Sequence, residues 1–239
     1  MDERRDGMKR CILFLLLFLP LFAAAEETEL VPFWNEATGQ FSLPPEYHVY
    51  QNGGDDSPPS SLYVISKNGL CGFFDTRTGA FSGLLWHEVF DHLACDHLVP
   101  VMDNQGLAGY ASRESGDLVI PCLYASVYPA SFSQGIAAVA YEDPLPGQTE
   151  DYFLIDETGA VIPLPEGITA VYGAQAQDSR ILIQEKATGL YGYASLEGNV
   201  VIPPRYAQAQ DFCGGYARVT QGEKTFFIDP QGNPASQAL

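Results

Sequence analysis

The chain has 239 residues, of which 46% are hydrophobic, and it carries 30 Asp and Glu against 12 Lys and Arg. This apolar share is sufficient for a buried core in one or two globular units. The formal net charge of −18 argues against nucleic acid as a partner, because phosphate contacts require basic side chains. It argues in the same way against anionic lipid surfaces.

Residues 1–25 have the pattern of a secretory signal peptide. Basic residues at positions 9–10 precede an apolar run at residues 11–19, and alanines at residues 23–25 precede the first acidic stretch. The run is too short to cross a bilayer as a helix. We therefore predict cleavage after Ala25 and a secreted or extracytoplasmic mature chain with no membrane span. Removal of the signal peptide takes away four basic and three acidic residues, so the mature net charge is −19.

Two questions about the covalent chain stay open at this stage. Translation starts at Met1 or at Met8, because the first seven residues contain acidic side chains that a signal peptide normally lacks. The cysteines after the signal peptide form two disulfides, as an exported chain allows, or remain buried thiols. These cysteines are Cys71, Cys95, Cys122 and Cys213.

From residue 31 onward, one motif recurs roughly every 40 residues. In each copy an Asn, Asp or Ser is followed three or four residues later by a Gly, which is the pattern of a hairpin turn with a left-handed glycine. In chain order the turn glycines are Gly39, Gly79, Gly116, Gly159, Gly198 and Gly232. Self-similarity at this period indicates an array of one small supersecondary unit.

Short runs of β-branched and aromatic residues flank the turns, for example at residues 153–155 before a turn and 200–202 after one. A proline follows the second run, as at Pro121 and Pro203, and we expect it to end the strand because it lacks a backbone donor. A separate third strand then carries a tyrosine that packs against a neighbouring unit, and a fourth strand follows another glycine. These tyrosines are Tyr47, Tyr124 and Tyr206.

Four short strands in about 40 residues is the size of a propeller blade. No segment after the signal peptide has a long helical period. We therefore predict an all-β fold of tandem β-meander or hairpin repeats, propeller-like with about five units, and keep an open, solenoid-like stack as the alternative. The repeat domain spans residues 26–239, with units near residues 31–65, 69–102, 106–142, 151–186 and 189–221 and a partial unit at residues 224–234.

The copy at residues 189–219 resembles the WG-repeat family of bacterial proteins. The similarity lies in residues 191–192 (Tyr-Gly), 201–206 (VIPPRY) and 212–215 (FCGG), and it extends in weaker form over most of residues 31–234. The chain has no literal Trp-Gly pair, since the tryptophan position holds Cys71, Ala108 or Tyr191. The resemblance implies a repeat scaffold used for binding and brings no catalytic residues.

Residues 86–97 concentrate groups that can bind a metal, and three histidines there could hold zinc. Their five-residue spacing suits no single helical face, and the metalloprotease pattern HExxH is absent, so we expect a divergent polar loop without a metal or cofactor. A Gly-, Ser- and Pro-rich insertion carries two acids, fewer fixed oxygens than calcium requires. The candidate binding residues of these two segments are Asp55, Asp56, Trp86, His87, His92 and His97.

The function predicted from these features is that of a non-enzymatic, exported interaction module whose partner is an extracellular protein, peptide or glycan. The alternative is a carboxylate-dependent, glycosidase-like hydrolase on a propeller scaffold, which would need paired acids on inner strands. Most acids here fall in turns and loops. Because the shared positions serve turns and packing, we expect the partner where the units differ, at residues 52–61, 86–97 and 143–151.

Overall fold

The computed structural model describes residues 33–35, 37–51, 61–125, 130–141 and 151–235. Within these residues the chain forms 20 β-strands and one short 3-10 turn, η2 (Asp91–Leu93). The strands pair antiparallel with their neighbours along the chain, which confirms the prediction of an all-β meander. No helix in this part of the chain is long and apolar enough to cross a membrane.

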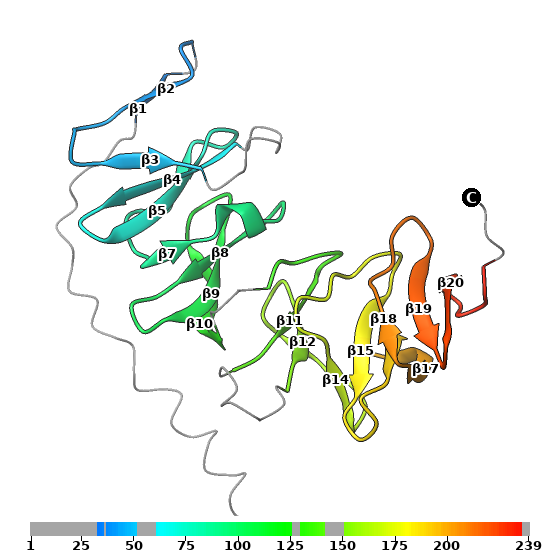
Figure 1. Ribbon diagram of the computed structural model, residues 1–239. Helices are drawn as coiled ribbons and strands as arrows, with labels where there is room; N and C mark the ends of the chain where they lie inside the picture. The colour runs from blue at the N-terminus through cyan, green and yellow to red at the C-terminus, as the bar shows by residue number, and fades with distance from the viewer. Residues whose placement is uncertain (1–32, 36, 52–60, 126–129, 142–150, 236–239) are drawn as a thin grey trace, which may run out of the picture.

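The strands form six sheets that follow one another in chain order (Figure 1). The first two sheets are β1 (Phe33–Asn35) with β2 (Gln40–Ser42), and β3 (His48–Tyr50), β4 (Leu62–Lys67), β5 (Leu70–Asp75) with β6 (Ala80–Phe81). The next two are β7 (Glu88–Val89), β8 (Leu98–Met102), β9 (Leu107–Ser112) with β10 (Leu118–Ala125), and β11 (Ile136–Val139), β12 (Phe153–Asp156) with β13 (Val161–Ile162). The last two are β14 (Ile168–Ala170), β15 (Ile181–Glu185), β16 (Tyr191–Ala194) with β17 (Val200–Tyr206), and β18 (Gln208–Ala209), β19 (Ala217–Gln221) with β20 (Lys224–Ile228).

The described sheets form an open row. Figure 1 shows the β1–β2 hairpin at one end of the molecule and the β18–β20 sheet at the other, and no pairing among the described strands joins these two sheets. The sheet boundaries are shifted from the sequence repeat. The β14–β17 sheet takes two strands from the copy at residues 151–186 and two from the copy at residues 189–221. Neighbouring copies therefore share a sheet, which couples them through backbone hydrogen bonds.

Two of the prolines after the turns do not end their strands, contrary to the sequence prediction, whereas β2 and β13 do end before Pro44 and Pro163. β10 continues through Pro121 and β17 through Pro203. Both are the outermost strands of their sheets, where proline is tolerated because the strand has only one paired neighbour. β17 bulges there: a step of two residues along β16, from Tyr193 to Tyr191, matches a step of four along β17. The segment expected as a separate tyrosine strand is thus the end of the same strand.

β10 has the same register shift against β9, and a glycine on the neighbouring strand lies opposite the bulge in both β10 and β17. A Cβ atom on Gly192 would stand 2.4 Å from the backbone oxygen of Ile202 and 2.7 Å from the nitrogen of Pro204. A Cβ atom on Gly109 would stand 2.6 Å from the backbone oxygen of Ile120. These glycines follow the family's tryptophan position, and the motif requires them because the bulged neighbouring strand approaches backbone to backbone.

All six turn glycines have positive φ, from 62° at Gly39 to 83° at Gly232. Some of these turns also pack against the preceding sheet. A Cβ atom on Gly159 would lie 3.2 Å from the side chain of Ile120, and one on Gly232 would lie 3.3 Å from that of Ile202. The turn glycines therefore permit the left-handed backbone and also allow a close contact between sheets.

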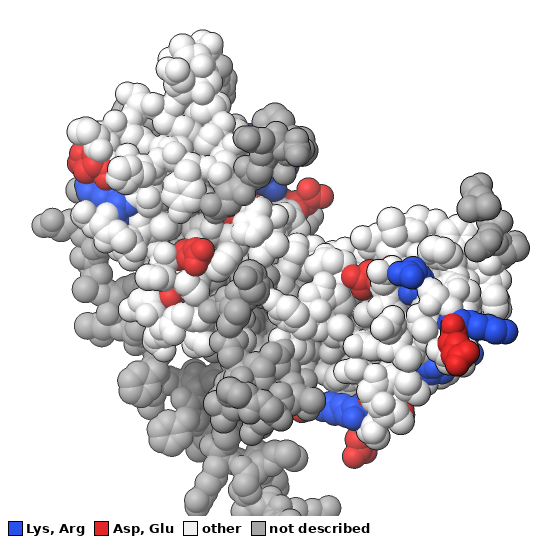
Figure 2. Space-filling view, viewed as in Figure 1, with Lys and Arg blue, Asp and Glu red and all other residues white. Residues whose placement is uncertain are grey.

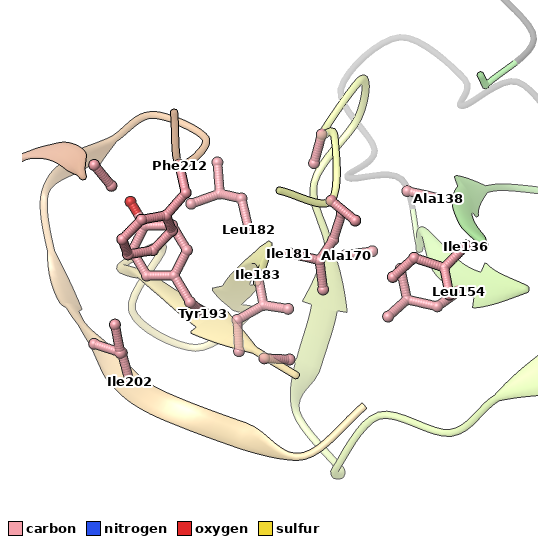
Figure 3. Packing of buried hydrophobic residues seen from close by; sticks show 14 of the residues in the cluster. Ile136, Ala138, Leu154, Ala170, Ile181, Leu182, Ile183, Tyr193, Ile202 and Phe212 are labelled. Atoms are coloured by element: carbon pink, nitrogen blue, oxygen red, sulfur yellow. The ribbon is translucent and has the colours of Figure 1, made fainter. Parts of the chain in front are cut away.

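A tyrosine joins one sheet to the loop of the next sheet at two places. The ring of Tyr110 packs against Phe132 with centroids 4.9 Å apart, and that of Tyr193 packs against Phe212 at 4.8 Å (Figure 3). Each hydroxyl donates to the backbone carbonyl two residues before that phenylalanine, at 2.8 and 2.7 Å. Such rings bury a large apolar area while their polar tip keeps a hydrogen-bond partner.

The tyrosines that follow the prolines also pack against the next sheet, as expected. Tyr124 lies 6.2 Å from Phe153 between ring centroids, and Tyr206 lies 6.3 Å from Phe226. Both tyrosines are buried, with 4% and 1% of their surface exposed. The aromatic residues of the repeat are therefore used mainly to stack the sheets.

A buried ion pair links two neighbouring sheets. The Asp75 side chain at the end of β5 is fully buried and contacts Arg113, which follows β9, at 2.5 Å, while Arg77 binds it from the same turn at 3.0 Å. Arg113 also donates to the Ser61 hydroxyl at 2.8 Å. Burial alone would raise the pKa of Asp75, but hydrogen bonds from Arg77 and Arg113 outweigh it and lower the pKa to about 2.

Candidate binding site

The residues singled out in the sequence occupy different environments. Trp86 is a core residue with 7% of its surface exposed, and its backbone bridges to Cys71 through hydrogen bonds of 2.7 and 3.0 Å. It packs in one cluster with Phe73 and Val89. Residues 86–91 are thus partly a sheet edge and core, and not a polar loop throughout, because Trp86 and Val89 fill the space between two sheets.

The three histidines of this segment, His87, His92 and His97, are exposed. In the described part of the chain, no three or more His, Cys, Asp or Glu side chains come close enough together to hold a metal ion. Asp55 and Asp56 lie outside the described residues, as do most of the segments 52–61 and 143–151. The structure therefore does not gather the described candidates, Trp86 and the three histidines, into one site.

The four cysteines are unpaired in the structure. Cys71 is buried, Cys95 and Cys122 are partly buried, and Cys213 is exposed. Burial raises the pKa of the Cys122 thiol to about 11, with the nearby carboxylate of Asp103 contributing. Of the two alternatives left open by the sequence, the geometry is that of free thiols.

A groove lies between two loops that occupy corresponding places in successive sheets. One loop joins β14 to β15 and the other joins β18 to β19. The backbone N–H of Gln175 donates to the Asp211 carboxylate at 3.0 Å, and that of Gly215 donates to Asp178 at 2.8 Å. These two bonds hold the loops side by side, because each loop supplies the carboxylate of one bond.

The groove has a volume of about 410 Å³, at the lower end of the range of about 300–1,000 Å³ that is typical of small-ligand sites. Its lining residues are Val171, Tyr172, Gly173, Ala174, Gln177, Leu182, Ala209, Gln210, Asp211, Phe212 and Cys213. Figure 3 shows Phe212 and Leu182, from the two neighbouring sheets, close to one another beside Tyr193. The lining thus mixes apolar and polar surface in similar shares, and its polar side chains include two amides, one phenol and one carboxylate.

Asp211 is the charged group of this lining. Its Oδ2 atom accepts the Gln175 N–H bond, whereas its Oδ1 atom is buried and has no hydrogen-bond partner among the described residues. Burial raises the pKa of the carboxyl, and the bond from Gln175 offsets only part of this effect. A buried carboxylate oxygen without a partner is energetically costly, so Asp211 favours a ligand that supplies a hydrogen-bond donor.

The mouth of the groove carries exposed groups that a ligand can contact. Tyr172 exposes 50% of its surface, and its ring lies 5.5 Å from that of Tyr152 between centroids. Gln177, Gln210 and Cys213 are also exposed. The site thus combines an aromatic surface, two amides and an acid, which suits recognition of a ligand with both apolar and hydrogen-bonding parts.

Sequence reasoning missed this groove. Asp211 was one acid among many, and its position immediately before Phe212 was the available signal. In the corresponding place before Phe132 stands Ser131, whose hydroxyl donates to the Leu93 carbonyl at 3.0 Å. An ionisable group in a position that another copy fills with a small hydrogen-bonded residue can be recognised by aligning the copies.

Comparison with known proteins gave a family match over part of the chain. Residues 191–224 match the family model described as WG containing repeat. No curated protein sequence matches the chain. Similar solved structures include the computationally designed Ika4 protein, at 15% identity over 61% of this chain and 95% of that chain with a TM-score of 0.35. A second is BamB from Moraxella catarrhalis, at 15% identity over 74% of this chain and 70% of that chain with a TM-score of 0.30. A third is a eukaryotic initiation factor, at 12% identity over 84% of this chain and 69% of that chain with a TM-score of 0.36. Residues 191–224 are thus similar to a WG containing repeat.

Proposed function

We propose that this chain is an exported, non-enzymatic repeat scaffold that binds an extracellular protein, peptide or glycan in the groove formed by residues 171–177 and 209–213. The observation that carries the proposal is the buried Oδ1 atom of Asp211, which has no partner among the described residues and belongs to a side chain that lines the groove. Residues 1–25 support export, since they have the pattern of a signal peptide.

The residues that pack between sheets are different from the residues that are exposed beside the groove, and this difference supports binding. Tyr193 and three of the turn glycines, Gly116, Gly198 and Gly232, are used in packing between sheets, and their burial leaves them no contact with a partner. Tyr172 and Gln210, in contrast, are exposed beside the groove. The lining contains one carboxylate, whereas glycoside hydrolysis generally uses two, and this favours binding over catalysis.

Peptide and glycan arrays probed with the mature chain test this function. Cys213→Trp places a large ring at an exposed position of the groove and should abolish the signals. Tyr216→Trp is the matched control, because Tyr216 is 48% exposed on the same loop and does not belong to the groove lining. Array signals that survive Cys213→Trp would place the binding site elsewhere, and the absence of any signal would argue against a binding function.

A further inference from the structure

Asp211 differs from the buried acid of the ion pair in how its charge is compensated. Asp75 is held by the guanidinium groups of Arg77 and Arg113. Asp211 receives one backbone N–H, from Gln175, and no basic side chain is among the residues that line its groove. The Asp75 carboxylate has its cations within the fold, whereas no basic side chain among the described residues forms an ion pair with Asp211.

The fold does not require a charge at position 211. The hydrogen bond from Gln175 needs only an acceptor, which the amide oxygen of an asparagine would supply equally well. Ser131 fills the corresponding place in an earlier copy as a neutral, hydrogen-bonded residue. The negative charge of Asp211 therefore contributes nothing to the loop that a neutral side chain could not contribute.

The groove lining suits a long cationic side chain, which has an aliphatic stem as well as a charged group. Val171 and Ala209 are partly exposed and provide apolar contact for an aliphatic stem, while Tyr172 is half exposed and can stack on a planar group. The exposed amides of Gln177 and Gln210 offer further acceptor oxygens. A guanidinium is planar and has five N–H donors, so it can use several of these acceptors at once.

The surface of the chain is compatible with a cationic partner. The net charge of −18 raises the local concentration of cations around the protein. On the face seen in Figure 2, basic side chains are scattered singly and do not form a continuous patch that would repel such a partner.

We infer that the groove binds an arginine side chain of a partner polypeptide, with the guanidinium against Asp211 and the stem along Val171 and Ala209. This inference rests on the proposed binding function and narrows it from any extracellular ligand to a basic peptide segment.

The test compares two peptides that differ only in charge, hexaarginine amide and hexacitrulline amide, because citrulline keeps the shape of arginine without its positive charge. Binding is measured at physiological salt to the mature chain, to Asp211→Asn and to Glu223→Gln. Glu223 is exposed at the β19–β20 turn, so its variant makes the same change in net charge away from the groove. The melting temperature of Asp211→Asn establishes that the variant is folded.

We expect hexaarginine to bind, Asp211→Asn to weaken it by about tenfold or more, Glu223→Gln to change it by less than about twofold, and hexacitrulline not to bind. Equal loss in both variants would mean that only the overall charge attracts the peptide, and the inference would fail. It would also fail if hexacitrulline bound as well as hexaarginine, or if neither peptide bound. If a neutral oligosaccharide such as chitohexaose bound instead and required Asp211, the arginine assignment would be wrong while the binding function would stand.

Discussion

Replacing Gly198 with alanine tests whether the turn glycines hold neighbouring sheets together. Gly198 has φ of +82°, and a Cβ atom there would lie 2.3 Å from the carbonyl oxygen of Pro163 and 3.2 Å from the side chain of Ile162, both in the preceding sheet. Gly189 is the matched control, because it has φ of +70° but its added Cβ would meet nothing closer than 3.9 Å. The two variants share backbone strain and differ in the contact between sheets.

The expected magnitudes follow from these distances. A left-handed alanine costs about 1–2 kcal/mol at either site. At Gly198 the Pro163 carbonyl must also move by roughly 1 Å, and overpacking of this kind adds about 1–3 kcal/mol. Gly198→Ala should therefore lower the free energy of unfolding by about 2–5 kcal/mol, and Gly189→Ala by about 1–2 kcal/mol.

Urea unfolding of the mature chain, followed by tyrosine and tryptophan fluorescence, measures both losses. Thermal unfolding gives a second reading, at roughly 2–4 °C for each kcal/mol in a chain of this length. Equal losses in the two variants would show that Gly198 suffers only backbone strain. The reasoning that the hairpin turn packs against the preceding sheet would then be refuted.

Three further predictions concern charged and thiol groups. Arg113→Met should lower the free energy of unfolding, measured in urea, by about 2–4 kcal/mol at neutral pH. The folded-state pKa of Asp75 lies below its unfolded value, so this loss should shrink as the pH falls from about 4 towards 2. A loss that does not depend on pH would contradict the ion pair between Asp75 and Arg113. Asp211→Asn should raise the melting temperature at pH 7, because the raised pKa of Asp211 in the folded chain means that its charge destabilises the fold. This gain should disappear below about pH 4, where the carboxyl is protonated in both the folded and the unfolded state. A lowered melting temperature at pH 7 would argue against an uncompensated charge. When the protein is treated with maleimide at neutral pH and examined by mass spectrometry, Cys213 should be modified and Cys122 should not. The reason is that the Cys122 thiol is partly buried and its pKa is about 11, whereas Cys213 is exposed. Early modification of Cys122 would contradict its partly buried position.

The turns could be predicted from sequence because their determinants are local. An Asp or Ser that hydrogen-bonds the following backbone, with a glycine three residues later, fixes a turn without help from the rest of the chain. In the structure the Asp156 side chain accepts from the backbone N–H groups of Thr158 and Ala160, at 2.9 and 3.0 Å. The positive φ of Gly159 completes this turn.

The strand ends could not be predicted in the same way. Whether Pro203 ends a strand depends on whether the other side of that strand has a partner, and this is a property of the whole sheet. The role of Gly192 was hidden for the same reason. Its need for a hydrogen atom in place of a side chain comes from the backbone of Ile202 and Pro204, which a turn residue does not contact.

The candidate site was harder to predict than the fold. Trp86 is followed by polar residues in the sequence, yet it lies in the core because its backbone bridges to Cys71 of β5, which places it in one cluster with Phe73. The groove depends on two loops separated by about 35 residues, each of which has an ordinary composition by itself. Their contacts, from Gln175 to Asp211 and from Gly215 to Asp178, bring the lining together.

The repeat itself explains why a functional site would lie in these loops. The turn glycines that contact the preceding sheet are constrained, since a change such as that at Gly198 disturbs the neighbouring sheet as well as its own. The loop between the first and second strands of a sheet is under less constraint, because its backbone needs only one or two bonds to the next loop. Ser131 and Asp211 occupy corresponding places in two copies, and each makes one hydrogen bond to an earlier loop, Ser131 as donor to the Leu93 carbonyl and Asp211 as acceptor from the Gln175 N–H. The carboxylate differs from the hydroxyl in carrying a charge that burial makes costly, and packing alone gives no reason to retain it. Binding of a cationic ligand supplies that reason, because the ligand would compensate the charge that the fold leaves unpaired.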